Sequence, residues 1–346
     1  MGIYTVLENP EIDETIESHL KLIIEELSKI TQVREIILGG GFGRGEGSVI
    51  LRNGKIRPVN DYDIFVIADD EKCADFVKLE KKLADKIDIR LVDIIPIRYS
   101  SLSVLPATQF YYDLKYGGKH LWGEKLLDSM PAFKKGRLEK NAPKTLLLNR
   151  MICAIEAYSE DFRNRKMNEE ESFFLINQTG KVVSSCVEAL LMKKHIYHHS
   201  LRQRKKIFES EFMKEKELIS LNDTATRFKL DPSSPPPSDP LNYWEKTVCE
   251  LINAITGFIS PGFFNPVKRI FKKLTNDKTK KSATNIPVER VEILLLLCKS
   301  AQPPMRYKLL SLARGEFEEI TGEDAKSFNW ETLREKTARH WHQIHK

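Results

Sequence analysis

Apolar residues recur every three or four positions between residues 11 and 30, and acidic and lysine side chains lie between them. This spacing predicts an amphipathic helix, because a period of 3.6 residues places such positions on one helical face. The short apolar run at 33–38 (VREIIL) ends abruptly at glycines, which predicts a strand followed by a turn. A second strand is expected at 61–68 (DYDIFVIA), with acidic residues at its start.

The region between and after these strands continues the alternation of strands and helices. Asn53-Gly54 separates two short β-prone runs, which is a strong hairpin pattern. A helix is expected at 71–86, followed by a buried strand at 87–97. From about residue 141 the pattern becomes mainly helical. We therefore expect an α+β protein, with a short mixed sheet flanked by helices in the N-terminal part and a mainly helical C-terminal domain.

The length of the chain predicts two domains, since 346 residues is about twice the size of a typical domain. We place them at 1–130 and 141–346. The segment 231–240 (DPSSPPPSDP) is expected to be an exposed linker, because proline lacks the N–H group and fixes φ. The polar, basic stretch 276–284 is expected to be a loop.

Composition excludes several classes of protein. A net charge of +6 is compatible with phosphorylated ligands but is far from that of a protein that coats nucleic acid, so a nucleic-acid partner is not favoured. The five cysteines are scattered and never spaced as a metal-binding pair, which predicts reduced thiols and a cytoplasmic location. No stretch reaches the roughly 18 apolar residues that a membrane span requires.

The glycine-rich stretch 39–48 (GGGFGRGEGS) is the first candidate for chemistry. It does not fit the dinucleotide-binding pattern GxGxxG in any register, because Arg44, Glu46 or Ser48 stands where the third glycine should be. It does not fit a P-loop either, because no Lys-Ser or Lys-Thr follows a glycine at the required place. What remains is a strand, a glycine turn and, some twenty residues later, the sequence Asp-Tyr-Asp.

Asp61 and Asp63 are the second candidate. Residues two apart in a strand point to the same side, and like charges held so close repel unless a cation lies between them. Carboxylate oxygens suit Mg²⁺ or Mn²⁺. A third carboxylate on a neighbouring strand would complete a two-metal site of the kind that supports phosphoryl displacement. Asp88 and Asp93 are available, and because an odd number of positions separates them, only one can face the pair.

In these features the chain resembles the polymerase-beta-like nucleotidyltransferases, in which a strand, a Gly-Gly or Gly-Ser turn, a D-x-D strand and a third acid on a later strand follow in this order. ILGGGFGRGEG resembles the turn of the minimal nucleotidyltransferases, and NDYDIFVI resembles their D-x-D strand. KIDIRLV is similar to the third-acid strand of DNA polymerase beta, which favours Asp88 over Asp93. GGKHLWG is similar to a motif that closes the catalytic domain in aminoglycoside adenylyltransferases. The resemblance covers roughly residues 30–125.

The resemblance implies a set of residue roles. Gly40 and Gly41 would let the backbone approach the phosphates of a nucleoside triphosphate, and Arg44 would neutralise phosphate charge. Gly41 stands where the family often has a serine, so backbone N–H groups would have to suffice there. The implied metal ligands, for Mg²⁺ or Mn²⁺, are Asp61, Asp63 and Asp88.

The activity implied by the resemblance is transfer of a nucleoside monophosphate from a nucleoside triphosphate, ATP or CTP, to a hydroxyl or phosphate of a small-molecule acceptor, with release of pyrophosphate. A second reading has RNA ends or a protein as the acceptor, as in toxin–antitoxin modules. A third is an inactive nucleotide-binding sensor, and the presence of all three carboxylates argues against it. The acceptor, the general base and the oligomeric state stay open.

Overall fold

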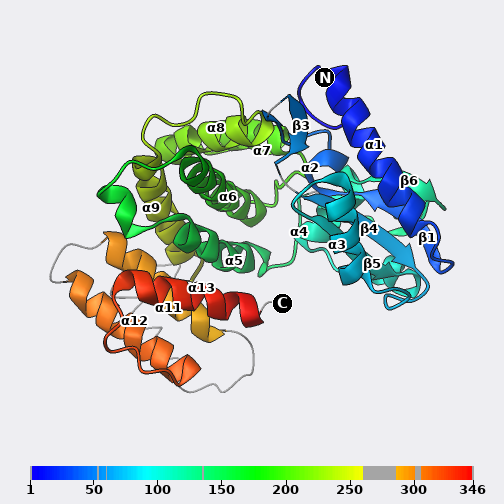
Figure 1. Cartoon of the computed structure of the whole chain (residues 1–346). Coiled ribbons are helices and arrows are strands. Elements are labelled where there is room, and N and C mark those ends of the chain that lie inside the picture. The colour runs from blue at the N-terminus through cyan, green and yellow to red at the C-terminus, as the bar shows by residue number, and fades with distance from the viewer. Residues whose placement is uncertain are drawn as a thin grey trace. The chain divides into compact units, whose positions relative to one another are not determined.

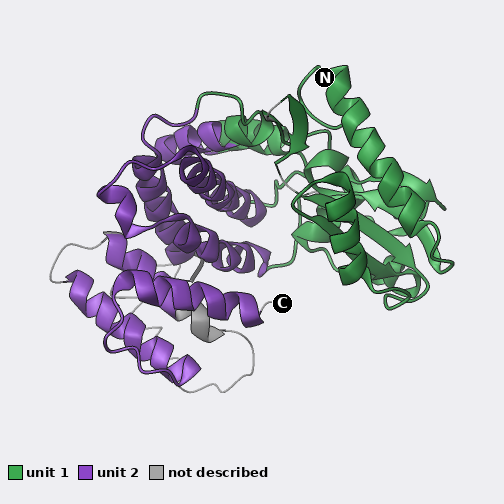
Figure 2. Cartoon of the chain, viewed as in Figure 1, with its two compact units in different colours: residues 1–140, 194–211, 226–235 green, residues 141–193, 212–225, 236–346 purple. Residues whose placement is uncertain are grey.

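The computed structural model of the chain describes residues 2–52, 54–59, 61–134, 136–259, 286–300 and 305–344. It is α+β, as expected, with a small mixed sheet in the N-terminal part and a mainly helical C-terminal part. The chain divides into two compact units (Figure 2). The first unit contains residues 1–140, 194–211 and 226–235, and the second contains 141–193, 212–225 and 236–346.

The first unit contains the strands (Figure 1). Their bounds are β1 Val33–Leu38, β2 Val49–Arg52, β3 Lys55–Pro58, β4 Tyr62–Ala68, β5 Val92–Arg98 and β6 Lys119–Gly123. The helices of this unit are α1 Pro10–Leu27, α2 Gly40–Gly43, α3 Phe76–Ile87, α4 Gln109–Gly117 and α7 Leu201–Glu211, with the 3₁₀ turns η1 Tyr99–Val104 and η2 Leu127–Ser129. The predicted first helix and the first two predicted strands are thus confirmed to within a few residues.

Four strands form one sheet in the order β5-β4-β1-β6. Strand β1 pairs antiparallel with both β4 and β6, whereas β4 and β5 are parallel. The predicted hairpin is confirmed as the antiparallel pair β2 and β3, and Gly54 in its turn has a φ of +72°. Asn53 lies outside the described residues.

The core of the first unit explains why β4 reads as a nearly continuous apolar run. Tyr62, Ile64 and Val66 belong to a buried cluster that also contains the apolar faces of α1 and α3. The alternate residues point to the opposite face. There Phe65 packs against Phe110 of α4, with ring centroids 4.9 Å apart. The side chain of Asp63 is on this second face, with Phe65.

The boundary between α3 and β5 differs from the expectation. Strand β5 begins at Val92, so the strand predicted to start at residue 87 was placed too early. Helix α3 continues to Ile87 and ends at Asp88, which adopts the left-handed conformation with a φ of 54°. Aspartate tolerates this conformation better than most residues, and it is a common way for a helix to end.

The second unit is helical, as expected. Its elements are α5 Ala142–Ala157, η3 Glu160–Arg163, α6 Glu169–Lys193, α9 Pro240–Ile259, α11 Ile286–Ser300, α12 Met305–Thr321 and α13 Trp330–Ile344. Trp244 of α9 is buried, stacks on Tyr158 at 4.3 Å between centroids, and donates a hydrogen bond from Nε1 to the carbonyl of Ala154. Among the described residues no helix is long and apolar enough to cross a membrane. The loop expected at 276–284 lies outside the described residues.

Two segments from the region assigned to the helical domain are part of the first unit instead. These are residues 194–211, which include α7, and residues 226–235, which include the end of α8 (Lys216–Leu230). In the proline-rich segment, residues 231–239 are neither helix nor strand. They connect α8 to α9, which begins at Pro240, as expected of a linker. The chain therefore passes between the units five times, and late segments contribute to the unit that holds the sheet.

Candidate functional site

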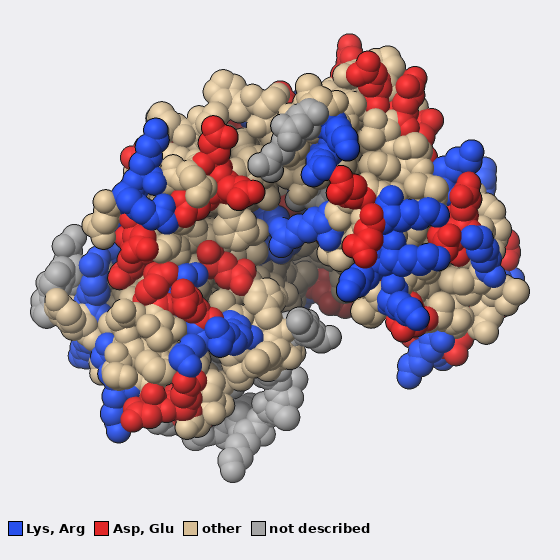
Figure 3. Space-filling view, in the orientation of Figure 1, with Lys and Arg blue, Asp and Glu red and all other residues tan. Residues whose placement is uncertain are grey.

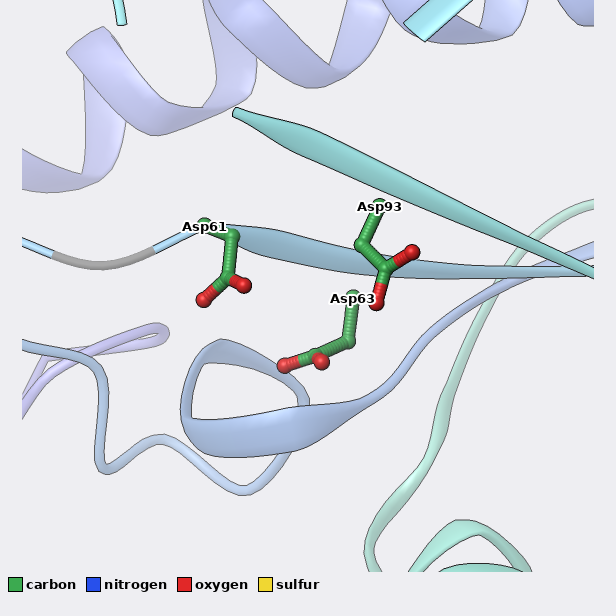
Figure 4. Close-up of side chains that lie close together, drawn as sticks. All are labelled: Asp61, Asp63 and Asp93. Carbon is green, nitrogen blue, oxygen red and sulfur yellow. The ribbon is translucent and has the colours of Figure 1, made fainter. Parts of the chain in front are cut away.

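Three aspartates meet on the face of the sheet opposite α1 and α3 (Figure 4). One carboxylate oxygen each from Asp61, Asp63 and Asp93 lies within 4.8 Å of the others. Asp63 and Asp93 are direct register partners in the parallel pair β4 and β5, so their side chains project to the same side. Asp61 precedes Asp63 by two residues and projects to that side as well. The structure therefore brings Asp61 and Asp63 together with a third acid, as predicted.

The third acid is Asp93 and not Asp88, which corrects the expectation drawn from the resemblance. Asp88 ends α3, its side chain is 72% exposed, and it forms an ion pair with Arg57 at 2.5 Å. Because β5 begins only at Val92, Asp88 is on no strand and has no register partner on β4. The reasoning that only one of the two could face the pair holds, but the choice between them was wrong.

The carboxyl group of Asp63 is electrostatically strained. Its pKa is raised to about 6, chiefly by burial and then by the charges of Asp61 and Asp93, although the positive charges of Arg44 and Lys229 lower it in part. The pKa of Asp93 is also raised, by burial and then by Asp61 and Glu80. Crowded, partly buried carboxylates favour a cation between them, and their hard oxygen donors fit a divalent metal such as Mg²⁺ or Mn²⁺.

The glycine turn lies directly against this cluster. The amide of Gly39 donates to the carbonyl of Asp63 at 2.8 Å. Gly40 has a φ of +57°, and a Cβ atom there would fall 1.7 Å from Oδ2 of Asp63, which no side chain could tolerate. A Cβ on Gly41 would lie 3.2 Å from the carbonyl oxygen of Glu46. Bare backbone is therefore a steric requirement at Gly40, and the turn leaves the carboxylate of Asp63 room that a side chain would take.

Arg44 follows the turn and is mostly buried, with 14% of its side chain exposed. Its Nε lies 3.5 Å from a carboxylate oxygen of Glu46, and one terminal nitrogen lies 3.7 Å from Asp113. Its charge also lowers the pKa of Asp63. Arg44 is thus a fixed positive charge beside the aspartates rather than an exposed loop arginine.

Sequence reasoning missed Lys229, whose positive charge also acts on Asp63. Lys229 lies in the last turn of α8, and its carbonyl accepts a hydrogen bond from the hydroxyl of Ser48, close to the glycine turn. The two residues are 181 positions apart. No local spacing could have indicated this contact.

The chain matches no family model, and no curated protein is significantly similar to it. The arrangement of the aspartates, the glycine turn and Arg44 therefore indicates by itself what chemistry this site can support.

Proposed function

We propose that the protein is a metal-dependent nucleotidyltransferase that moves a nucleoside monophosphate from a nucleoside triphosphate to an acceptor. The observation that supports this is the cluster formed by Asp63 and Asp93, on adjacent parallel strands, and Asp61, just before the first of them, with a side-chain-free turn packed against Asp63. Three carboxylates on one sheet face form a set of hard oxygen donors, and the neighbouring positive charges suit a ligand that carries its own negative charge.

The residues of the chain would divide the work as follows. Asp61, Asp63 and Asp93 would hold Mg²⁺ or Mn²⁺, which supplies charge neutralisation of phosphate oxygens and a lowered pKa for an acceptor hydroxyl when bound. Backbone N–H groups at Gly40 and Gly41 would approach the phosphates. The side chains of Arg44 and Lys229 would bind phosphate oxygens, a task for which the planar guanidinium of arginine is well shaped.

We further propose a small molecule as acceptor and the cytoplasm as the compartment. The net charge of +6 supports the first point, because nucleic-acid-binding proteins gather a basic surface. On the face shown in Figure 3, basic and acidic side chains are interspersed over the described surface rather than gathered in one basic patch. Transfer to RNA ends or to a protein is the alternative acceptor class, and an inactive nucleotide sensor is the non-enzymatic alternative.

The test is incubation of the pure protein with each of the four α-labelled nucleoside triphosphates, Mg²⁺ or Mn²⁺, and fractions of a cell extract. We expect label to enter one fraction and pyrophosphate to be released, with a small-molecule product that survives nuclease and protease. Asp61→Asn and Asp63→Asn should each abolish both signals. Unchanged pyrophosphate release in either variant would refute the proposal. Nucleotide binding without any transfer would favour the sensor.

A further inference from the structure

Glu46 is a buried carboxylate that reaches a distant part of the chain. Only 2% of the residue is exposed. Its oxygens accept hydrogen bonds from the hydroxyl of Ser200 at 2.6 Å and from the backbone amides of Leu201 at 2.8 Å and Arg202 at 3.2 Å. These donors are the start of α7, more than 150 positions away along the chain. A carboxylate is stabilised at such a helix N-terminus by the free amides and by the helix dipole.

Glu46 is charged at neutral pH. Burial alone would raise its pKa, but the hydrogen bonds from Ser200 and from the two amides, together with the charge of Arg44, bring it below its usual value. A buried ion is costly to keep unless its partners hold it well. Packing alone would be served by an apolar residue, so the retained charge calls for an explanation.

Capping of α7 is not a sufficient explanation. Ser200 already occupies the position before the first helical residue, and its hydroxyl accepts a hydrogen bond from the amide of Gln203 at 3.3 Å. This is the ordinary local cap of a helix that begins after a serine. Helix α7 therefore has its own start signal, and Glu46 adds a connection between α7 and the glycine turn.

Glu46 also forms two ion pairs, one with Arg202, whose Nε lies 3.6 Å from one carboxylate oxygen, and one with Arg44. The guanidinium of Arg44 lies between Glu46 at 3.5 Å and Asp113 at 3.7 Å. Asp113 is in turn held by the hydroxyl of Tyr197, which is 3.0 Å from both of its oxygens. The two carboxylates on either side of Arg44 are thus both hydrogen-bonded to residues within 197–202. The positive charge of Arg44 between them lowers the pKa of Asp63.

We propose that Glu46 is a positioning residue for the aspartate site, which fastens Arg44 to the segment 197–202 so that its guanidinium is held ready for a phosphate. This inference rests on the proposed function, because it assigns the phosphate of a metal–polyphosphate ligand to Arg44. Without the carboxylate of Glu46, Arg44 keeps its charge but loses one of its two ion-pair partners. Its long side chain is then more mobile, and ordering it on phosphate binding reduces the net binding free energy.

The chain offers a matched control in Glu35. It is equally buried and accepts hydrogen bonds from the amides of Leu126 and Leu127 at 2.8 and 2.9 Å, with His120 Nδ1 at 2.8 Å from its other oxygen. Like Glu46, it is held by two backbone amides and one further side chain, here an imidazole in place of the hydroxyl of Ser200, but it forms no ion pair with Arg44. Glu35→Gln makes the same chemical change at a comparable burial without touching the ion pairs of Arg44.

The experiment measures binding of inorganic triphosphate with Mg²⁺ by calorimetry, a probe that needs no knowledge of the nucleobase. We expect Glu46→Gln to weaken binding about tenfold, which is the size of the cost of ordering one long side chain on binding. Arg44→Ala should weaken it at least as much, and adding Glu46→Gln to Arg44→Ala should cause no further loss, because Glu46 acts through Arg44. Glu35→Gln should bind like the wild type. Losses that multiply in the double variant, or an equal loss in Glu35→Gln, would overturn the proposal.

A readout without any ligand separates this inference from the proposed function. Arg44 Nε is buried in the wild type and lies 3.5 Å from its ion-pair partner Glu46, although its N–H group forms no hydrogen bond with any residue that the structure describes. Because the site is shielded from water, this N–H proton, followed by NMR on arginine-labelled protein, should exchange slowly. Glu46→Gln should speed that exchange about tenfold or more, and Glu35→Gln should not. If the wild-type protein binds no triphosphate, the proposed function fails, and the exchange rate of the Arg44 Nε proton alone tests the role of Glu46. An exchange rate in Glu46→Gln equal to that of the wild type would refute the positioning role of Glu46. If Glu46→Gln does not fold, Ser200→Ala replaces it in both experiments. We expect the same weaker triphosphate binding and faster proton exchange, each by a smaller factor.

Discussion

Replacing Asp63 by asparagine should make the metal-free protein more stable at neutral pH, although it removes a proposed metal ligand. The carboxyl group has a pKa of about 6 in the folded chain, against 3.8 as its ordinary value, chiefly because it is buried and then because Asp61 and Asp93 lie beside it. The folded state therefore holds the proton more tightly than the unfolded state. The stability associated with this proton is fully present below pH 3.8 and is lost as the pH rises through 6.

The size of the effect follows from the two pKa values. At about 1.4 kcal/mol for each tenfold change in proton affinity, the charged carboxylate costs about 3 kcal/mol of folding free energy at pH 7 and roughly half of that at pH 5. Asparagine has nearly the same shape and no charge, so Asp63→Asn should recover most of this cost. We expect a gain of about 2–3 kcal/mol at pH 7, smaller at pH 5 and absent near pH 3.5.

The measurement is native-state hydrogen exchange of the β1 and β4 amides in EDTA, which reports the opening free energy of the first unit. Asp88→Asn is the matched control, since Asp88 is exposed and paired only at the surface, and it should change stability by less than about 0.5 kcal/mol. Mn²⁺ at about one thousand times the dissociation constant should reverse the order, because only the wild type gains, by about 4.1 kcal/mol. A correctly folded Asp63→Asn that is no more stable than the wild type at pH 7 would refute the electrostatic argument.

Two further predictions concern the same site. Asp93→Asn should weaken Mn²⁺ binding, measured by electron paramagnetic resonance, about tenfold or more, whereas Asp88→Asn should bind like the wild type; the opposite order would restore Asp88 as the third ligand. Gly40→Ala should lose Mn²⁺ binding and cost about 1–3 kcal/mol by thermal unfolding, since its φ is +57° and its Cβ would collide with Asp63. Gly315→Ala is the control, because nothing lies within 4 Å of the added Cβ, and a similar loss there would contradict the steric explanation.

The elements of the first unit that could be predicted from sequence are those fixed by local pattern. The 3.6-residue period gave α1, whose start is strengthened by Asn9, which accepts a hydrogen bond from the amide of Glu11, and by Pro10 in the first turn. Short apolar runs bounded by glycines or acids gave β1 and β4, and Asn53-Gly54 gave the hairpin. Each of these depends on residues that are neighbours in sequence.

Which segments of the chain belong to which unit could not be predicted from local pattern. Residues 194–211 and 226–235 have helical patterns like the segments around them, and nothing local distinguishes a helix that packs on other helices from one that returns to the sheet. What decides it are contacts over long sequence distances, such as those of Glu46 with Ser200 and of Ser48 with the carbonyl of Lys229.

In the candidate site, too, local patterns predicted some features and contacts between distant residues decided the others. That Asp61 and Asp63 share a side follows from the alternation of a strand, and the need for a third carboxylate follows from charge. Choosing Asp88 or Asp93 required knowing where α3 ends, and KIDIRLV reads equally well as a strand from residue 87. In the structure the left-handed turn at Asp88 ends the helix, β5 starts four residues later, and the register then pairs Asp93 with Asp63. The end of a helix, and not the pattern of the strand, therefore selects the third carboxylate, and a similarity of strand sequence is weak evidence for a ligand wherever a helix could extend into it.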